Sequence, residues 1–426
     1  MLFSALPWSL YFLLPVRAFD AAPRYVVNYI LDLVLTYHRW GQAVALLSNS
    51  LLIHGGKTDQ FNSYSYNSAP NTNDLLYLPL TSSFSAASPP WILVSNSTNS
   101  SSSLGLAWHT LSPSNLPNLL LFGGIPDPDS ATVEVSLADS AELLNVASPL
   151  QPVWFLKPTS WAGEPVRRMR HSAATSSSNQ VFITGGEMAD GSGNAFSDHY
   201  VFNPTVSSFT LLPPNGPPDI YGHASVILSD GRLLVFGGYS PSEGTLLPFS
   251  TIWVLDTSSQ SNLAWTVIQS STNSLPSPRM GFATASLNNG CILIHGGSDA
   301  ELQTNFADGW ILNTSQSIMG WTQVEALSQL GARRDHFAAP QGDLVLFGFG
   351  KRKTLYQKSM LTKGLIKVMM TMVQHPLRCR YTTALPNLSF LCSNPCHLLK
   401  PLLQTHKRAN LLPVQPYDLQ ARLQVR

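Results

Sequence analysis

The stretch Leu233-Leu-Val-Phe-Gly-Gly238 is a short apolar run that ends in a pair of glycines, and five other stretches of the chain repeat it. The copies are LLIHGG at 51–56, LLLFGG at 119–124, VFITGG at 181–186, LLVFGG at 233–238, ILIHGG at 292–297 and the imperfect copy LVLFGF at 344–349. Their first glycines lie 52 to 68 residues apart. A strand-based repeat of about 50 residues with insertions predicts a β-propeller.

Further residues recur around the glycine pairs. Upstream, an Arg or an aromatic residue precedes Gly or His and then Ala, and the instances are Arg39-Trp-Gly-Gln-Ala43, Arg170-His-Ser-Ala-Ala174, Tyr221-Gly-His-Ala224, Arg279-Met-Gly-Phe-Ala283 and Arg334-Asp-His-Phe-Ala338. Downstream, aromatic residues come in pairs, which are Tyr77 and Trp91, Tyr200 and Phe209, Trp253 and Trp265, and Trp310 and Trp321. The second repeat is the weakest and keeps Trp108 and Trp154.

These residue types suit a four-stranded propeller blade. Glycine permits positive φ and close backbone approach where a strand leaves the crowded centre. The predicted repeat glycines are Gly55, Gly56, Gly123, Gly124, Gly185, Gly186, Gly237, Gly238, Gly296, Gly297 and Gly348. Aromatic side chains bury about 150 to 250 Å² each, and we expect them between neighbouring blades. The predicted blade aromatics are Tyr77, Trp91, Trp154, Tyr200, Trp253, Trp265, Trp310 and Trp321.

On these motifs the chain resembles the kelch-repeat family, with a galactose-oxidase-like central domain, over residues 39–350. The resemblance implies an all-β kelch β-propeller of about six blades, with seven as the alternative. The low charged fraction of 12% agrees with a β protein that buries one large core. The aromatic pair that would complete the sixth blade never appears after Gly350. We therefore expect the last blade to be incomplete, with an unpaired edge beside the first blade.

Residues 1–18 have the character of a signal peptide. Leu2 to Val16 is apolar and uncharged, and Val16-Arg17-Ala18 offers small residues for cleavage after Ala18. An uncleaved anchor is the alternative, but Arg17, Asp20 and Arg24 interrupt the apolar run. Acceptor sequons at Asn96, Asn99 and Asn313 agree with export. We therefore expect a glycosylated protein that is secreted or displayed at the cell surface.

Residues 19–38 form an N-terminal segment that breaks the repeat pattern. The stretch YVVNYILDLVLTYH at 25–38 separates Ala22-Pro23-Arg24 from Trp40-Gly41-Gln42-Ala43, and these flanks would join into the motif of the other repeats. An insertion is one interpretation. An ordinary first strand or short helix is the other.

Residues 351–426 differ sharply from the rest of the chain. They hold 13 Lys plus Arg and one acidic residue, Asp418, whereas residues 1–350 hold 12 basic and 23 acidic residues. An arm for nucleic acid or anionic lipid is one interpretation. A metal site at Cys392, Cys396 and His397 is another, although the spacing is poor for zinc. We favour a shifted reading frame or mis-spliced gene model, which predicts a disordered tail. No apolar run long enough to span a membrane follows residue 18, although cell-surface relatives of this kind often have one.

No motif in the chain combines a nucleophile, a base and a group that orients them. We predict a binding protein without catalysis, cofactor or metal. Its ligand would be a protein or a cell-wall glycan, and not nucleic acid. The loops 57–74, 82–103 and 125–150 would carry the binding face. The sequence has no signal for the oligomeric state.

Two other functions remain as alternatives. A galactose-oxidase-like copper radical enzyme would need a Cys linked to a Tyr, a second Tyr beside a His, and another His. The repeats contain one thiol, Cys291, and the adjacent pair Tyr37-His38 lies in the interrupting segment. We interpret His54 and His295 as core or channel-lining residues, because they occupy equivalent strand positions. The other alternative is an intracellular kelch scaffold for cell polarity.

Overall fold

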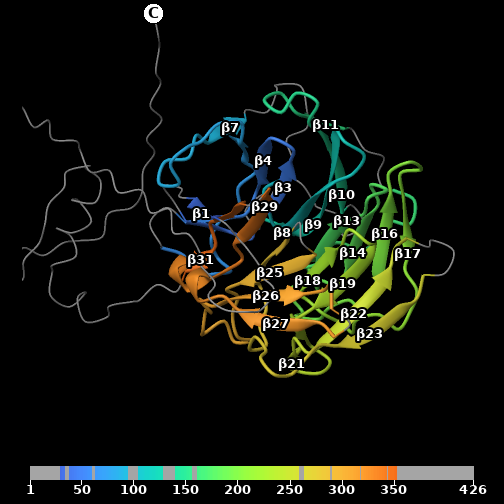
Figure 1. Cartoon of the computed structure of the whole chain (residues 1–426). Helices are drawn as coiled ribbons and strands as arrows, with labels where there is room; N and C mark the ends of the chain where they lie inside the picture. The colour runs from blue at the N-terminus through green and yellow to red at the C-terminus, as the bar shows by residue number, and fades with distance from the viewer. Residues whose placement is uncertain are drawn as a thin grey trace, which may run out of the picture. The chain divides into compact units, whose positions relative to one another are not determined.

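The computed structural model consists of β-sheets arranged around a common axis (Figure 1). It describes residues 29–33, 38–59, 63–94, 104–127, 140–155, 161–258, 263–287, 290–316, 318–342 and 344–352. Five of the sheets have four strands, and we call them blades 1 to 5 in chain order. Blade 1 contains β3 (Ala43–Leu47), β4 (Ser50–His54), β6 (Leu75–Pro79) and β7 (Ile92–Val94). Blade 2 contains β8 (Leu106–Pro113), β9 (Asn118–Pro126), β10 (Ala141–Asn145) and β11 (Val153–Trp154). Blade 3 contains β13 (Ser172–Thr175), β14 (Val181–Thr184), β16 (His199–Asn203) and β17 (Ser208–Leu211). Blade 4 contains β18 (Ala224–Ile227), β19 (Arg232–Phe236), β22 (Thr251–Asp256) and β23 (Trp265–Gln269), and blade 5 contains β24 (Ala283–Ser286), β25 (Cys291–His295), β26 (Gly309–Asn313) and β27 (Gly320–Gln323).

Blade 6 has three strands among the described residues. Its first two are β29 (Phe337–Gln341) and β30 (Leu344–Gly348), which pair antiparallel like the inner strands of the other blades. The third is β1 (Tyr29–Leu33), which pairs with β30 in parallel. The third strand of every other blade pairs antiparallel with the second. The last blade thus borrows a strand from the N-terminal segment, and it lacks a fourth strand within the described part of the chain.

Four short two-stranded sheets lie outside the blades. They are β2 (His38–Trp40) with β5 (Lys57–Asp59), β12 (Arg168–Met169) with β15 (Glu187–Met188), β20 (Tyr239–Ser240) with β21 (Thr245–Leu246), and β28 (Arg333–Arg334) with β31 (Lys351–Arg352). One 3₁₀ helix, η1 (Glu325–Leu330), lies between β27 and β28 and buries Leu327 and Leu330. Strand β31 lies at the predicted start of the basic tail, so the ordered sheet structure continues to Arg352.

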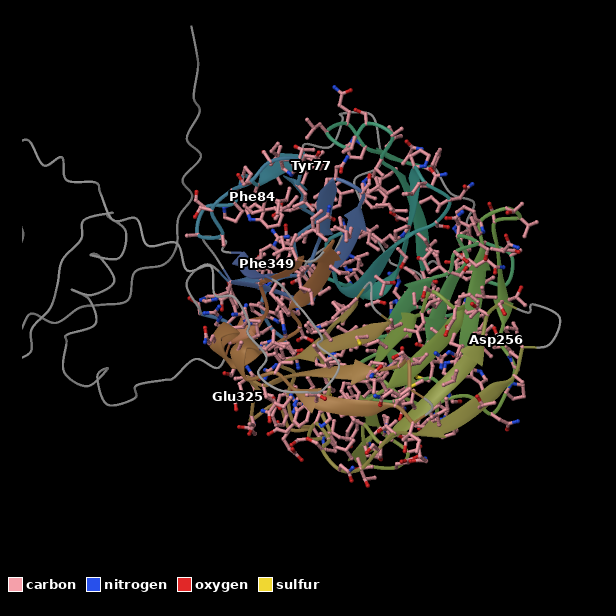
Figure 2. All side chains as sticks on the ribbon, viewed as in Figure 1. Tyr77, Phe84, Asp256, Glu325 and Phe349 are labelled. Atoms are coloured by element: carbon pink, nitrogen blue, oxygen red, sulfur yellow. The ribbon has the colours of Figure 1, made fainter. Side chains whose placement is uncertain are left out.

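Six apolar clusters lie between the blades, one for each pair of neighbours. They join blades 1 and 2, 2 and 3, 3 and 4, 4 and 5, 5 and 6, and 6 and 1. The last of these contains Leu51 of β4 and Leu346 of β30, both fully buried. Phe349 joins the same cluster, against which Phe84 of the β6–β7 connection packs (Figure 2). A single blade could not cover both of its apolar faces, and the six clusters cover them all.

The innermost backbone forms a closed cycle of hydrogen bonds, which we call the hub ring. Five members lie two positions before the first strand of their blade, and Trp108 lies within the first strand of blade 2, β8. The six members are Gly41, Trp108, Arg170, Gly222, Gly281 and Asp335. Each amide donates to the carbonyl oxygen of the preceding member, at 2.7 to 3.0 Å for five bonds. The amide of Gly41 closes the cycle by donating to Asp335 at 3.3 Å. The closed cycle has one member per blade, and the predicted β-propeller of six blades is confirmed for the described residues.

The repeat glycines are required by close contact with the next blade. Gly185 has a φ of 53°, and a Cβ there would lie 2.4 Å from the carbonyl oxygen of Ile220. Gly296 has a φ of 68°, and a Cβ there would lie 2.4 Å from the carbonyl oxygen of Arg333. No side chain fits at that distance, so the first glycine of the pair lets adjacent blades meet at the hub.

The sixth copy of the pattern is shifted by one residue from its predicted register. Gly348 ends β30 and pairs with Phe337, as His54 ends β4 and pairs with Ala43. The two positive φ angles therefore fall on Phe349 at 65° and Gly350 at 89°. Gly348 was predicted as a repeat glycine, but the structural equivalents of the glycine pair are Phe349 and Gly350. The error arose because the sequence Gly348-Phe349-Gly350 has a glycine on each side of Phe349, so the repeat motif can be aligned on either glycine.

Several predictions concern residues outside the described part of the chain. These are the signal peptide at 1–18, most of the segment 19–38, and the tail from 353 onward. Within the segment 19–38, residues 29–33 form strand β1, as the strand interpretation predicted, and not a helix. Among the described residues, no helix combines the length and apolar character that crossing a bilayer requires.

Candidate binding site at the mouth of the central channel

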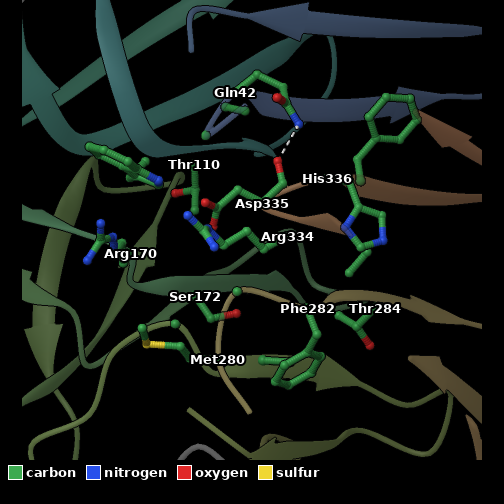
Figure 3. A pocket seen from close by; sticks show the side chains of 18 of the residues that line it. Gln42, Thr110, Arg170, Ser172, Met280, Phe282, Thr284, Arg334, Asp335 and His336 are labelled. Carbon is green, nitrogen blue, oxygen red and sulfur yellow. Dashed lines mark hydrogen bonds between the residues drawn. The ribbon is translucent and has the colours of Figure 1, made fainter. Parts of the chain in front are cut away.

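A cavity of about 310 Å³ lies on the axis, where the hub ring meets the first strands of the blades. All six hub-ring residues line the cavity, and the lining draws on every blade. Figure 3 shows Gln42, Arg334 and Asp335 approaching the cavity from one side, and Met280, Phe282 and Thr284 from another. The side-chain Nε2 of Gln42 donates to the backbone carbonyl oxygen of Asp335 at 3.4 Å. The cavity is therefore lined by both polar and apolar side chains.

Three members of the hub ring are not glycine, although all six have a positive φ. Trp108, Arg170 and Asp335 have φ angles of 55°, 54° and 52°. Residues with a Cβ adopt this left-handed conformation at a cost of about 1 to 3 kcal/mol. The other three blades place glycine at the same position, so the fold itself does not require a side chain there. The three larger residues therefore make the mouth a candidate site.

All three of these side chains converge on Tyr66, which the connection between β5 and β6 brings over the mouth. The phenol hydroxyl of Tyr66 donates a short hydrogen bond to Oδ2 of Asp335. The ring centroid of Tyr66 lies 5.5 Å from that of Trp108, and the Arg170 guanidinium also lies 5.5 Å from it. Burial and the nearby Asp335 carboxylate raise the pKa of Tyr66, which keeps its hydroxyl protonated and able to donate.

Two further side chains complete the surroundings of Tyr66. The guanidinium of Arg334 lies 4.2 Å from the centre of the phenol ring, at a distance typical of cation–π contacts. Trp40 stacks against the ring at 6.3 Å, and its indole nitrogen donates to the carbonyl oxygen of Tyr66 at 3.2 Å. We call Trp40, Trp108, Arg170, Arg334 and Asp335 the phenol cradle.

The charges at the mouth are largely balanced. Arg170 forms an ion pair with Glu187 at 2.9 Å, and both side chains are close to nine-tenths buried. Burial raises the pKa of Glu187, an effect that Arg170 opposes. Arg334 donates to the carbonyl oxygen of Leu302 at 3.1 Å and to Oδ1 of Asn305 at 2.7 Å. The two positive charges of Arg170 and Arg334 are thus matched by the two negative charges of Glu187 and Asp335.

Histidines bridge the blades around the channel. His54 Nδ1 shares a hydrogen bond with His109 Nε2 at 2.8 Å, and His295 Nδ1 shares one with His336 Nε2 at 2.9 Å. Burial lowers the pKa of His54 to about 3 and that of His295 to about 4, so both rings are neutral at pH 7. The two predicted channel histidines thus serve as neutral links between blades 1 and 2 and between blades 5 and 6.

The structure places some of the residues that the copper-enzyme alternative would use. No group of three His, Cys, Asp or Glu side chains within the described ranges is arranged to hold a metal ion. Cys291 is 1% exposed, and burial raises the pKa of its thiol to about 11. His38 opens strand β2, and Tyr37 is outside the described residues.

Buried arginines, which the sequence located only in part, anchor the glycine pairs. Arg39, Arg168 and Arg279 each donate to the carbonyl oxygen of the first glycine, at 2.8 to 3.1 Å. Each also pairs with an Asp just before the third strand of its blade, and these partners are Asp74, Asp198 and Asp308. The motif analysis aligned Arg170 and Arg334 with Arg39 and Arg279, but Arg168 and Arg333 hold the equivalent positions. Arg333 donates to the carbonyl oxygen of Phe349 at 3.5 Å. The RRMR and RRD runs each contain a second arginine, and that ambiguity hid the two residues of the mouth.

The predicted blade aromatics lie in the clusters between blades. The outer-strand residues pack on the preceding blade: Trp91 on Phe349 at 5.6 Å, Trp154 on His54 at 5.5 Å, Trp265 on His199 at 5.4 Å and Trp321 on Phe249 at 5.3 Å. Tyr77, Tyr200, Trp253 and Trp310 belong to or pack against the same clusters.

The predicted glycosylation sites fall in different environments. Asn96 and Asn99 are outside the described residues. Asn313 is 4% exposed at the end of β26, and its Oδ1 accepts hydrogen bonds from the amide and hydroxyl of Ser315. A glycan on Asn313 would have to disrupt that turn. Burial therefore disfavours modification at Asn313.

Comparison with known proteins agrees with this geometry. Residues 108–351 match the KLHDC2/KLHL20/DRC7 Kelch-repeats domain, which covers more than half of the chain. The chain belongs to the kelch-repeat family. The kelch propeller is 29% identical to Adagio-like protein 1 of Oryza sativa subsp. japonica over 54% of this chain and 35% of that protein. It is 25% identical to the F-box/kelch-repeat protein At1g51550 of Arabidopsis thaliana over 50% of this chain and 45% of that protein.

A human protein also shows similarity. The chain is 26% identical to Multiple epidermal growth factor-like domains protein 8 of Homo sapiens, over 47% of this chain and 7% of that protein. The chain spans about a third of the length of the adagio-like relatives that it matches. The similarity therefore concerns the propeller and not the whole of these relatives.

Proposed function

We propose that this kelch propeller is a non-catalytic binding module that takes a segment of a partner protein at the mouth of its central channel. The observation that carries the proposal is the set Trp108, Arg170 and Asp335 at hub-ring positions where the backbone favours glycine. Left-handed strain at residues with a Cβ clusters at ligand sites, where the side chain repays its cost. Nothing in the ring itself requires these side chains, because Gly41, Gly222 and Gly281 complete it equally well.

The residue types at the mouth support a protein ligand. Trp, Tyr and Arg dominate the energetics of protein interfaces, and the phenol cradle with Tyr66 consists mainly of these three types. The cavity of about 310 Å³ is at the lower end of the range for small-molecule pockets. It would hold one or two side chains of a partner. Propeller surfaces bind through connections on one face of a rigid scaffold.

We further propose that the protein acts in the secretory pathway or at the cell surface. The apolar residues 2–16 and the sequons at Asn96 and Asn99 support this location. Expression in a secreting eukaryotic cell should release a protein whose mass falls on endoglycosidase treatment. An Asn96→Gln/Asn99→Gln variant should lose that mass change. Retention in the cytosol with an unmodified mass would contradict the proposed location.

Photo-crosslinking tests the proposed binding face. A photoreactive amino acid would replace Leu302, which lines the cavity, or Val206, which is 64% exposed in the β16–β17 turn. Antiparallel strands put that turn at the opposite end of its blade from the mouth. We expect a discrete protein adduct from position 302 alone, lost when Arg334→Gln is combined with it. The purified adduct partner should then bind the wild type at least about tenfold more tightly than Arg334→Gln.

The outcomes separate the ligand classes. A carbohydrate adduct at position 302 would favour the glycan as ligand. Equal adducts at both positions, or an adduct at position 206 alone, would contradict a binding site at the mouth.

A further inference from the structure

Tyr66 lies in the mouth as a bound side chain would. Its hydroxyl meets Asp335, its ring lies 4.2 Å from the Arg334 guanidinium, and Trp40 stacks on it. Its neighbours in the chain point elsewhere, since Ser63, Tyr64, Ser65, Asn67 and Ser68 are all exposed. The connection between β5 and β6 therefore delivers the Tyr66 side chain into the cradle while these five neighbours stay in solvent.

The strained positions of the hub ring coincide with the contacts of Tyr66. Trp108, Arg170 and Asp335 are its three residues with a Cβ, and all three contact Tyr66. The three glycine members are not among the ring and hydrogen-bond contacts of Tyr66. The backbone strain of the ring is thus confined to residues that build a place for a phenol.

The cradle is not fully satisfied by its present occupant. The Nε–H groups of Arg170 and Arg334 are buried and have no hydrogen-bond partner among the described residues. Arg334 as a whole is 7% exposed. Buried donors without partners are rare and call for a physical explanation. A ligand that brings acceptors beside its aromatic ring, such as a peptide backbone, would satisfy them.

We propose that the cradle is a phenol-binding site, that Tyr66 occupies it in the free chain, and that a tyrosine of the partner protein replaces Tyr66 on binding. This inference rests on the proposed function, because it names the chemical group that the mouth recognises. The Asp335 carboxylate accepts the phenol hydroxyl and sets the specificity. A phenylalanine would leave that half-buried carboxylate without its donor, which is unfavourable.

Titration with N-acetyl-L-tyrosinamide tests the proposal on the full chain. Tyr66→Phe removes the hydroxyl of the internal occupant and keeps its ring, so the competitor is weakened without opening a large cavity. We expect Tyr66→Phe to bind N-acetyl-L-tyrosinamide about tenfold more tightly than the wild type, because a hydrogen bond to a charged acceptor no longer has to be displaced. Tyr64→Phe is the matched control, since Tyr64 lies on the same turn and is 51% exposed. Its affinity should equal that of the wild type.

A second probe and a second variant test the role of Asp335. In the Tyr66→Phe chain, N-acetyl-L-phenylalaninamide should bind about tenfold more weakly than N-acetyl-L-tyrosinamide. Adding Asp335→Gly should abolish this discrimination. Glycine suits the φ of 52° at this position, so the hub ring is retained while the carboxylate is lost.

Exposure of the internal occupant gives an independent readout in the wild type. Nitration of tyrosine rings, located by mass spectrometry, should increase at Tyr66 when N-acetyl-L-tyrosinamide is added and stay constant at Tyr64. The inference is overturned if Tyr66→Phe binds the probe no better than the wild type, or if discrimination survives Asp335→Gly. If those results coincide with a partner adduct at position 302, the phenol site is wrong and the binding face stands. If the adduct is also missing, both fail.

Discussion

The amide of Gly41 donates a hydrogen bond to the carbonyl oxygen of Asp335 at 3.3 Å, and this bond joins the first blade to the sixth. It is the longest of the six bonds in the hub ring. A second bond supports it, since the amide of Gly350 donates to the carbonyl oxygen of Arg39 at 2.7 Å. The ring therefore closes at its hub even though the sixth blade has three described strands. Closure depends on the backbone after β30.

Replacing Gly350 should weaken that closure. Gly350 has a φ of 89°, and a Cβ there would lie 2.6 Å from Cβ of His336 and 2.8 Å from the carbonyl oxygen of Arg334. Gly244 has a φ of 65° with open space around it, so Gly244→Ala isolates the backbone cost. We expect Gly244→Ala to lower the free energy of unfolding by about 1 kcal/mol, and Gly350→Ala by about 2 kcal/mol more. Denaturant unfolding measures both, and equal losses would contradict the close contact at Gly350.

The hub-ring strain predicts an unusual order of stability at Arg170. Arg170→Gly and Arg170→Ala both remove the side chain, but alanine must still adopt the φ of 54°. We expect the glycine variant to be about 1 kcal/mol more stable than the alanine variant. At Arg232, in the regular strand β19, the order should be reversed. Thermal and denaturant unfolding of the four variants check this, and alanine as the more stable residue at both sites would show that the ring is unstrained.

The buried arginines should contribute far more to stability than a surface pair. Arg279 is fully buried and holds Asp308 through two bonds, at 2.6 and 2.9 Å. Arg279→Met would leave Asp308 without its partner and should cost about 3 kcal/mol or more. The exposed pair of Arg232 with Asp230 serves as the control, and Arg232→Met should cost at most about 1 kcal/mol. Similar losses for both variants in denaturant unfolding would argue against the anchoring role of Arg279.

The neutral channel histidines make the fold sensitive to acid. Burial lowers the pKa of His54, His171 and His223 to about 3, below the value of 6.5 for an exposed histidine. Below pH 6.5 these histidines bind protons in the unfolded chain but stay neutral in the folded chain. The free energy of unfolding is therefore highest above that pH and decreases as the pH falls toward 4. Each ring contributes a loss on the order of 1 kcal/mol per pH unit in this window.

One histidine variant isolates this effect from that of the carboxylates. His223 shares a hydrogen bond with Thr184 at 2.8 Å, and a glutamine at 223 keeps a polar group beside Thr184 without titrating. The free energy of unfolding of His223→Gln, measured between pH 7 and 4, should decline less steeply than that of the wild type. Parallel curves would mean that His223 does not titrate between the two states.

The sequence predicted the fold well because each blade repeats the same local requirements. The glycine pairs mark where one blade meets the next, as at Gly185 and Gly296, and the spaced aromatics mark the outer strands. The closure by β1 was less clear, since a parallel strand far from β30 in the chain leaves no repeat signal. The one-residue shift of the glycine pair to Phe349 and Gly350 was missed because a glycine lies on each side of Phe349, and the motif was aligned on Gly348.

The site was harder to predict than the fold. The hub-ring position holds three glycines and three unlike residues, so no residue type marks it in the sequence. Arg170 and Arg334 were noticed, but only as the arginine of the motif that precedes each glycine pair. Tyr66 lies in a long connection, and only folding brings it to Asp335, 269 residues away. A positive φ at residues with a Cβ was the missing signal, and it becomes visible only in the structure.

Hydrogen exchange at the hub tests the central claim most directly, because six blades closed into one ring require six protected amides. The measurement follows the amides of Gly41, Trp108, Arg170, Gly222, Gly281 and Asp335 in the full chain. We predict that all six exchange slowly, with Gly41 the fastest of them because its bond is the longest. Exchange of Gly41 at the rate of an unprotected amide, while the other five stay protected, would show that the ring is open between the sixth blade and the first.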